Sequence, residues 1–163
     1  MWALVAVGPL AGCLGTATYS NAPLFPEDIR SVYVEMFDNA TFRRGIEYTL
    51  SDALAKRVET LTSYKIVSDR DQADSVISGQ ITAAGESILT LEPDLGWALE
   101  KEAILTVEVS WKDLQTGRLM INNETVTAAA GYSAFQGQDF TYASAVAANK
   151  LAEKIVELME NPW

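Results

Sequence analysis

Apolar and polar side chains alternate in several stretches of the chain, and this period of two residues predicts β-strands. The pattern is clearest over residues 104–112, where every second side chain is apolar and those between are mostly polar. One face of this strand is therefore expected to be buried and the other to be open. Weaker patterns predict further strands at residues 32–37, 64–67, 75–86 with an extension over 88–91, and 118–130.

Two other stretches have the period of an α-helix. In the first, the side chains that recur every four residues are Ile46, Leu50, Leu54 and Val58. Asn39 or Thr41 is expected to cap the start of this helix. A second helix is predicted from Phe140 to Leu158, ahead of Pro162. Each helix has a single apolar stripe, so each is expected to cover one side of a sheet.

The order of the predicted elements is strand, helix, strand, a three-strand meander and a final helix. Because a helix separates the first two strands, at least one pair of strands is expected to be parallel. The sequence therefore predicts an α+β fold in which two helices pack on one face of a mixed, mostly antiparallel four- to five-stranded sheet, a two-layer sandwich. The opposite face would present the polar side chains of Thr106, Glu108, Ser110 and Lys112, with Thr125 and Thr127 beside them.

The first twelve residues are uncharged and mostly apolar. They are too few to cross a bilayer as a helix, which takes roughly 20 residues, and are typical of the apolar part of a signal peptide. The positively charged segment that usually precedes this part is missing, which would place the true start upstream of Met1. We expect a signal peptide at residues 1–12, a tether at 13–26 and a single domain at 27–163.

The end of this apolar run, Leu10-Ala11-Gly12-Cys13, resembles the lipobox of bacterial lipoproteins. In such proteins the cysteine is lipid-modified and becomes the mature N-terminus, and two or three acyl chains give stable membrane attachment. Leu14 follows where an aspartate would retain enterobacterial lipoproteins at the inner membrane, so the resemblance favours the outer membrane. The alternative is that Cys13 is a small apolar residue present by chance.

The composition excludes several classes of function. The chain has 22 acidic and 12 basic residues, and its net charge of −10 makes nucleic acid a poor partner. It contains no histidine and one cysteine, so Ser-His-Asp and Cys-His sites, an intramolecular disulfide and a cysteine-based zinc site are excluded. We expect neither a cofactor nor a metal ion.

Several segments together are similar to the lipopolysaccharide-assembly lipoproteins (LptE-like), in a divergent branch. They are residues 24–34, 36–39, 42–47, 73–81 and 155–163 behind the lipobox. The resemblance implies two helices on a mixed sheet, and a domain that sits as a plug inside a large outer-membrane β-barrel of the LptD type. It implies a lipid-anchored protein that faces the periplasm or the barrel lumen and assists delivery of lipopolysaccharide. Some members bind this glycolipid directly through basic residues.

Two groups of residues are candidates for binding a partner or lipopolysaccharide. Leu95 and Trp97 lie in an apolar loop between two predicted strands, where they either contact a partner or lipid, or fold back onto the sheet. The basic candidates are Lys101, Lys112 and Arg118, expected near the ends of the meander, and Arg43 and Arg44, expected at the start of the first helix. The alternative for all five is an ordinary solvated charge.

A second aromatic cluster precedes the last helix and is expected to hold that helix on the sheet. Its members are Tyr132, Phe135, Phe140 and Tyr142. Trp111 and Trp163 are assigned to packing.

A hydrolase would need two carboxylates, such as Glu100 with Glu102 or Glu153 with Glu157. The second pair lies beside Lys150 and Lys154, as on a solubilising helix face, and the first has no evident pocket to raise a pKa. An enzyme is therefore not expected. The main alternative to a lipopolysaccharide-assembly protein is a lipoprotein regulator or subunit of another outer-membrane export assembly.

Overall fold

The computed structural model describes residues 23–94 and 96–160. The predicted signal peptide, the lipidation site Cys13, most of the tether, and the predictions for Leu95 and Trp163 lie outside the described residues.

The described chain contains one six-stranded sheet with the order β3-β1-β4-β5-β6, and β2 pairs with β4 beside this path. The strands are β1 (Ser31–Val34), β2 (Asp38–Asn39), β3 (Lys65–Ile66), β4 (Ser75–Leu91), β5 (Ala98–Asp113) and β6 (Leu119–Tyr132). β1 is parallel to both β3 and β4, β2 is parallel to β4, and β4, β5 and β6 form the antiparallel meander. The predicted mixed sheet is confirmed, with two-residue β2 as the strand that the sequence pattern did not reveal.

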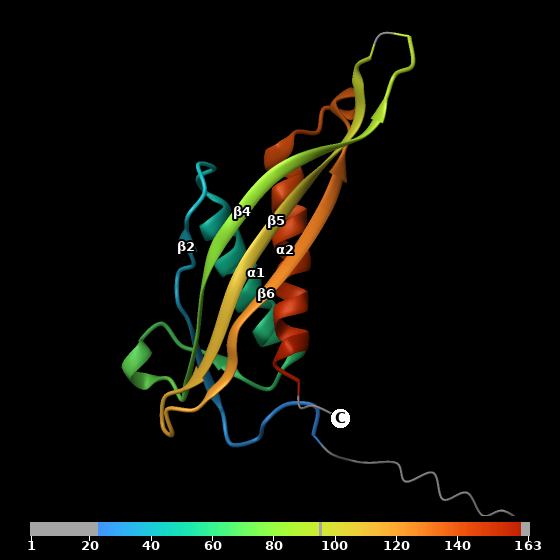
Figure 1. Cartoon of the computed structure of the whole chain (residues 1–163). Coiled ribbons are helices and arrows are strands. Elements are labelled where there is room, and N and C mark those ends of the chain that lie inside the picture. The colour runs from blue at the N-terminus through green and yellow to red at the C-terminus, as the bar shows by residue number, and fades with distance from the viewer. Residues whose placement is uncertain (1–22, 95, 161–163) are drawn as a thin grey trace, which may run out of the picture.

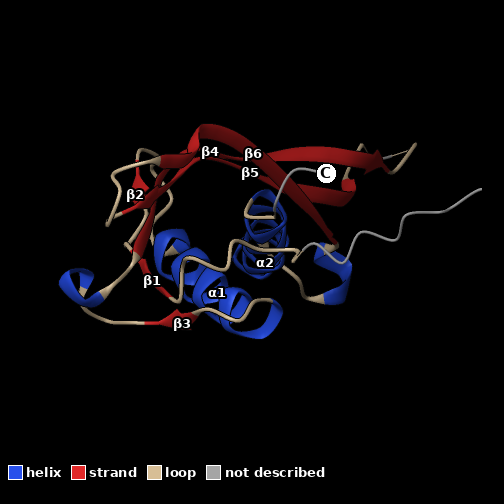
Figure 2. Cartoon of the chain, turned by 90° about the horizontal axis from the view of Figure 1, so that it is seen from below, coloured by secondary structure: helices blue, strands red, loops and turns tan. Residues whose placement is uncertain are grey.

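Two helices, α1 (Ile46–Leu61) and α2 (Phe140–Leu158), cover one face of this sheet. Viewed along the helices, they lie on the same side of the strands (Figure 2), with α1 against β1, β2 and β3 and α2 against β5 and β6. Two short 3-10 helices, Arg70–Gln72 and Ala134–Gln136, occupy connections. The predicted two-layer sandwich is confirmed. None of the helices in the described part is long and apolar enough to span a membrane.

The start of α1 differs from the prediction. Its N-cap is Gly45, with a φ of 94° that favours glycine, and the backbone N–H of Gly45 donates to the carboxylate of Glu47 at 3.0 Å. Asn39 belongs to β2, and its side-chain amide donates to Glu47 at 2.6 Å and to the carbonyl of Arg43 at 2.7 Å. The cap assignment to Asn39 or Thr41 was therefore wrong, because Asn39 is used to hold the loop ahead of the helix.

The core lies between the helices and β5. The side chains of β5 that face the helices are at most 1% exposed, as the alternation predicted: Ala103, Leu105, Val107, Val109 and Trp111. The indole N–H of Trp111 donates to the hydroxyl of Ser75 at 3.0 Å, which satisfies the one polar atom of this buried ring. The face away from the helices is polar, and on it the hydroxyls of Thr106 and Thr127 lie 3.1 Å apart.

The β4–β5 hairpin extends far beyond the two-layer body (Figure 1). β4 has 17 residues and β5 has 16, whereas β6 stops opposite Lys101. The last part of the hairpin is therefore a two-stranded ribbon, beside which the described residues form no third strand. This feature determines where the candidate site lies.

Candidate functional site

The outer end of the hairpin carries four large apolar side chains that are more than half exposed. They are Ile88 (55%), Leu89 (53%), Leu91 (53%) and Trp97 (61%). We refer to these four residues as the hairpin tip. Apolar side chains gathered in this way on a projecting element are typical of a surface that another molecule covers.

The turn that closes the hairpin is defined by two backbone hydrogen bonds. The N–H of Glu92 donates to the carbonyl of Trp97 at 2.8 Å, and the N–H of Gly96 donates to the carbonyl of Glu92 at 2.9 Å. Gly96 has a φ of 68°, in the left-handed region where glycine is favoured. Trp97 follows this turn and is 61% exposed, which favours contact with a partner over the alternative that it folds back onto the sheet.

The hairpin joins the body through a cluster of charged and aromatic side chains around Glu86. The guanidinium of Arg43 donates to Glu86 Oε1 at 2.8 Å, while the hydroxyl of Tyr132 and the ammonium of Lys101 bind Oε2 at 2.9 and 3.4 Å. Arg43 also stacks on the ring of Phe140, 3.6 Å from its centroid. We call these five residues the Glu86 cluster. It connects β4, β5 and β6 to the segment before α1 and to the first turn of α2.

The cluster changes the acidity of its members. The hydrogen bond from Tyr132 lowers the pKa of Glu86 most, and the bonds from Arg43 and Lys101 lower it further against an opposing effect of burial. Burial raises the pKa of Tyr132, and the neighbouring carboxylate of Glu86 adds to this rise. Glu86 is therefore held ionised, and Tyr132 is held as the hydroxyl donor.

The structure divides the predicted basic candidates between the two ends of the molecule. Lys101 and Arg43 both bind Glu86, so their charges are already paired. Lys112 lies eleven residues further along β5 from Lys101, about 36 Å at about 3.3 Å per residue, and Arg118 lies in the turn beside Lys112. All three residues lie near ends of the meander, as expected, but Lys101 cannot form one site with Lys112 and Arg118 because the long strands place the two ends far apart.

Arg44 is exposed and makes none of the ion pairs found among the described residues. With Arg43 and Gly45 it lines a cavity of about 350 Å³ between the first turns of α1 and α2. Both arginines were expected at the start of the first helix, and they lie just ahead of α1, which begins at Ile46.

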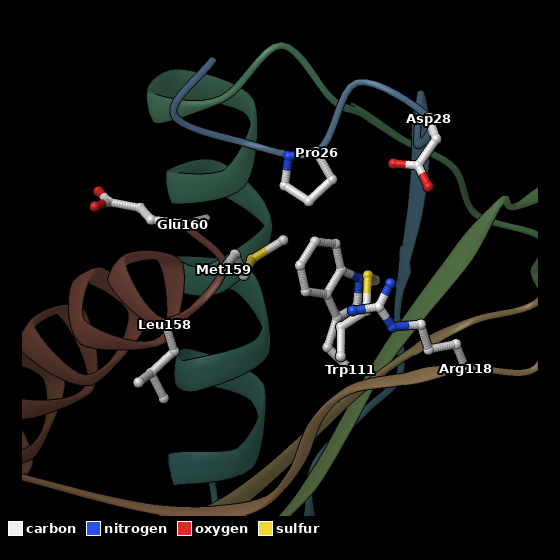
Figure 3. Close-up of a pocket in the computed structure, with 8 residues that line it drawn as sticks. Pro26, Asp28, Trp111, Arg118, Leu158, Met159 and Glu160 are labelled. Carbon is white, nitrogen blue, oxygen red and sulfur yellow. The ribbon is translucent and has the colours of Figure 1, made fainter. Parts of the chain in front are cut away.

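Arg118 borders a different cavity, of about 340 Å³, at the end of the molecule away from the hairpin tip (Figure 3). The indole of Trp111 and the side chain of Met159 lie in its centre, and Asp28 and Glu160 stand at its rim in this view. Its walls combine apolar groups with charges of both signs, so it favours no particular ligand.

The predicted aromatic cluster ahead of α2 forms only in part. Tyr132 is buried and Phe140 is half-buried under Arg43, whereas Phe135 (69%) and Tyr142 (51%) are exposed. The last helix is instead capped by Asp139, whose carboxylate accepts from the N–H of Tyr142 at 2.8 Å.

One carboxylate of each pair considered for a hydrolase has an ordinary structural partner. Glu100 accepts from the hydroxyl of Thr90 at 3.3 Å, and Glu153 lies 3.9 Å from Arg57 across the two helices. Among the described residues, no group of three or more His, Cys, Asp or Glu side chains could hold a metal ion.

Two structural roles escaped the sequence analysis. Asp74 accepts hydrogen bonds from the backbone N–H groups of Arg30 and Ser31, and from the side chains of Ser31 and Gln115. Burial raises the pKa of Asp74, but these donors outweigh it and the net pKa is lowered. Glu86 was likewise missed; the only signal was a single acidic residue within an otherwise uncharged strand.

The described chain is similar in fold to solved structures of low sequence identity. "Rare lipoprotein B from Shewanella oneidensis" has a TM-score of 0.52 at 15% identity, over 80% of this chain and 93% of that one. The "PelC dodecamer from Paraburkholderia phytofirmans" has 0.53 at 14%, over 87% and 96%. The "hypothetical protein CT253 from Chlamydia trachomatis" has 0.53 at 11%, over 78% and 94%. At these identities the likeness shows a shared fold.

No curated protein matches the chain by sequence. A family model does: the one described as "LptE: Lipopolysaccharide-assembly" matches residues 29–161, from just before β1 to just after α2. The match covers both helices, the whole sheet and the hairpin. The chain therefore belongs to the LptE family of lipopolysaccharide-assembly proteins.

Proposed function

We propose that this protein is a lipid-anchored outer-membrane lipoprotein that assists lipopolysaccharide assembly by binding a β-barrel translocon of the LptD type. Membership of the LptE family supports a non-enzymatic assembly role. The observation that carries the proposal is the hairpin tip, because these four apolar side chains are exposed at the outer end of the hairpin, and none of them belongs to the buried core.

The shape and charge of the hairpin tip favour a protein partner with an apolar recess. Complete burial of one large apolar side chain is worth roughly 1.5–3 kcal/mol, so four of them could supply much of a stable interface. Glu92, Asp94 and Glu100 lie within the same turn and strand ends, and their charges would repel the phosphates of an anionic lipid surface. A barrel lumen or loop with apolar and basic side chains would match both features.

The proposal is tested by affinity purification of the full chain from detergent-solubilised membranes of the source cell. The wild-type chain should recover a large β-barrel protein, and the double variant Leu91→Ser/Trp97→Ser should lose most of it. Tyr48→Ser is the matched control, since Tyr48 is 64% exposed but lies on α1, away from the tip. If the tip variant recovers the barrel as well as the control does, the hairpin tip is not the docking surface.

Attachment to the membrane through Cys13 is a separate part of the proposal. A palmitate analogue fed to cells should label the wild-type chain and not Cys13→Ala. Label that survives this substitution would exclude Cys13 as the modified residue.

A direct contact with lipopolysaccharide is proposed at the cavity beside Arg43 and Arg44. Arg44 is the exposed cation there, and the first turns of two helices border the same space. Photo-crosslinking to the glycolipid from residue 49, which lines the cavity, should fall sharply in Arg44→Ala and remain in Lys112→Ala. Equal crosslinking in both variants would argue against this site.

A second candidate is a subunit of another outer-membrane export assembly. It is favoured by the fold shared with PelC, which was solved as a dodecamer. Native mass spectrometry distinguishes the two candidates, since a ring subunit gives a large homo-oligomer and a barrel-bound factor gives a one-to-one complex with a different protein.

A further inference from the structure

The strand β6 forms one end of the sheet, and its outer edge lies beside α2 (Figure 1). β6 has 14 residues, and no described strand pairs with its outer side. An edge of this length presents backbone groups on which a strand of another molecule can pair. At the other end of the sheet β3 has only two residues, which is too short to offer such a surface.

Two lysines of α2 bind the backbone of β6 at this edge. The ammonium of Lys150 donates to the carbonyl of Ala129 at 3.0 Å, and the ammonium of Lys154 donates to the carbonyl of Thr127 at 2.7 Å. Four residues of a helix span about 6.0 Å and two residues of a strand about 6.8 Å. The two lysines therefore match the spacing of successive outward carbonyls, with α2 running antiparallel to β6.

These carbonyls identify the part of β6 that a further strand would use. In an antiparallel ladder, a residue directs its N–H and its C=O to the same side. Since the carbonyls of Thr127 and Ala129 point away from β5 to the lysines, their N–H groups also point outward. The close approach of the Thr127 and Thr106 hydroxyls across the ladder is what such a non-hydrogen-bonded pair produces.

We propose that Lys150 and Lys154 close the β6 edge against strand addition by a second copy of this chain. A second β6, laid antiparallel to the first, is the partner that this edge fits, because such pairing is symmetric and ends in a closed dimer. To form it, both ammonium groups would have to leave their carbonyls and make room for the incoming backbone. The inference does not depend on which protein the hairpin tip binds.

The test uses Lys150→Met/Lys154→Met in the full chain, purified in detergent and studied by sedimentation velocity over a concentration series. Methionine keeps the length of the side chain and a high helix propensity, so the substitution removes little besides the two ammonium groups. The wild-type chain should sediment as a monomer, and the double variant should double its mass as concentration rises. This is expected even though the variant carries two fewer positive charges and so repels itself more strongly.

Two further variants make the result specific. Lys56→Met/Lys112→Met changes the same charge and adds the same apolar surface on α1 and on the open face of the sheet, and it should stay monomeric. Thr127→Pro, added to the lysine double variant, removes an outward N–H without touching the β5–β6 ladder, and it should restore the monomer. Circular dichroism and thermal melts check that each chain is folded. If the double variant does not fold, Lys154→Met, which removes the shorter bond, takes its place.

The proposal is overturned if the lysine variant stays monomeric at the highest concentration. It is also overturned if the control pair dimerises equally, or if Thr127→Pro leaves the dimer intact, because pairing would then use another surface such as the hairpin tip. The proposal is supported if the wild type is a monomer, the lysine double variant is a dimer, and the addition of Thr127→Pro to that variant restores the monomer.

Discussion

The inner and outer halves of the β4–β5 hairpin both carry large apolar side chains and differ in what covers them. Val107 and Val109, in the inner half, are fully buried under the helices, whereas Ile88 and Leu89, in the outer half, are more than half exposed. The inner residues stabilise the fold because burial removes their surface from water. The outer residues cannot act in that way in the isolated chain, so their apolar character indicates contact with another molecule.

Truncation of one leucine in each half gives the largest contrast. Leu105→Ala, in the fully buried half, should lower the free energy of unfolding by about 2–5 kcal/mol through lost burial and the cavity left behind. Leu91→Ala, in the exposed half, should change it by less than about 0.5 kcal/mol. Urea denaturation of the two variants measures both values. A large loss in Leu91→Ala would mean that the tip contributes to the fold after all.

Substitution of each of the two glycines of β4 by alanine compares a tightly packed position with an open one, since each substitution adds one methyl group. A Cβ at Gly79 would meet the ring of Phe37 at 2.6 Å and collide with the carbonyl oxygen of Glu108, so Gly79→Ala should cost about 1–3 kcal/mol. A Cβ at Gly85 would meet nothing within 4 Å, so Gly85→Ala should be neutral or slightly stabilising. Thermal melts of both variants are the measurement. Equal melting temperatures would contradict the close approach at Gly79.

The fold was accessible from sequence because its strands and helices have local periodicity. The alternation at Leu105 and Val107 and the four-residue spacing of α1 define which side of each element is buried, and the two layers follow from that. The same alternation does not reveal what covers a strand, so the outer hairpin was not distinguished from the inner one. The sequence pattern did not predict β2 because two residues are too few to show a period.

The candidate site was predicted less well, because its contacts join residues far apart in the chain. Arg43 and Lys101 were singled out as free cations, whereas both are bound to Glu86. Lys150 and Lys154 were assigned to a solvated helix face, whereas both donate to carbonyls of β6. In each case the sequence shows the charge and not its partner, which depends on how strands and helices are placed in space.

Acid should weaken the Glu86 cluster, where the outer half of the hairpin meets the body, before it unfolds the core. The pKa of Glu86 is lowered below its ordinary value of 4.5, so the cluster stabilises the folded chain above about pH 4.5 and loses this contribution as the pH falls through the lower folded value. Glu86→Gln should therefore lower the free energy of unfolding at neutral pH by about 1 kcal/mol or less, since the site is partly solvated. It should also make the free energy of unfolding fall less steeply as the pH drops below 4.5. Urea denaturation at a series of pH values measures the slope. An unchanged slope would show that other carboxylates, such as Asp74, dominate.

The smallest expected effect is that of Tyr132→Phe on the Glu86 cluster. This variant distinguishes the contribution of the Tyr132 hydrogen bond to the pKa of Glu86 from that of the ion pairs with Arg43 and Lys101. Tyr132→Phe keeps the buried ring and removes the hydroxyl that donates to Glu86 at 2.9 Å. Because this bond is the largest cause of the lowered pKa, the pKa of Glu86 should rise toward its ordinary value while Arg43 and Lys101 still hold it somewhat below. An NMR titration of the Glu86 carboxyl carbon measures the change, and Lys101→Met is the companion variant, expected to shift the pKa less. A larger shift in Lys101→Met would mean that charge, rather than the tyrosine hydroxyl, keeps Glu86 ionised where the hairpin leaves the body.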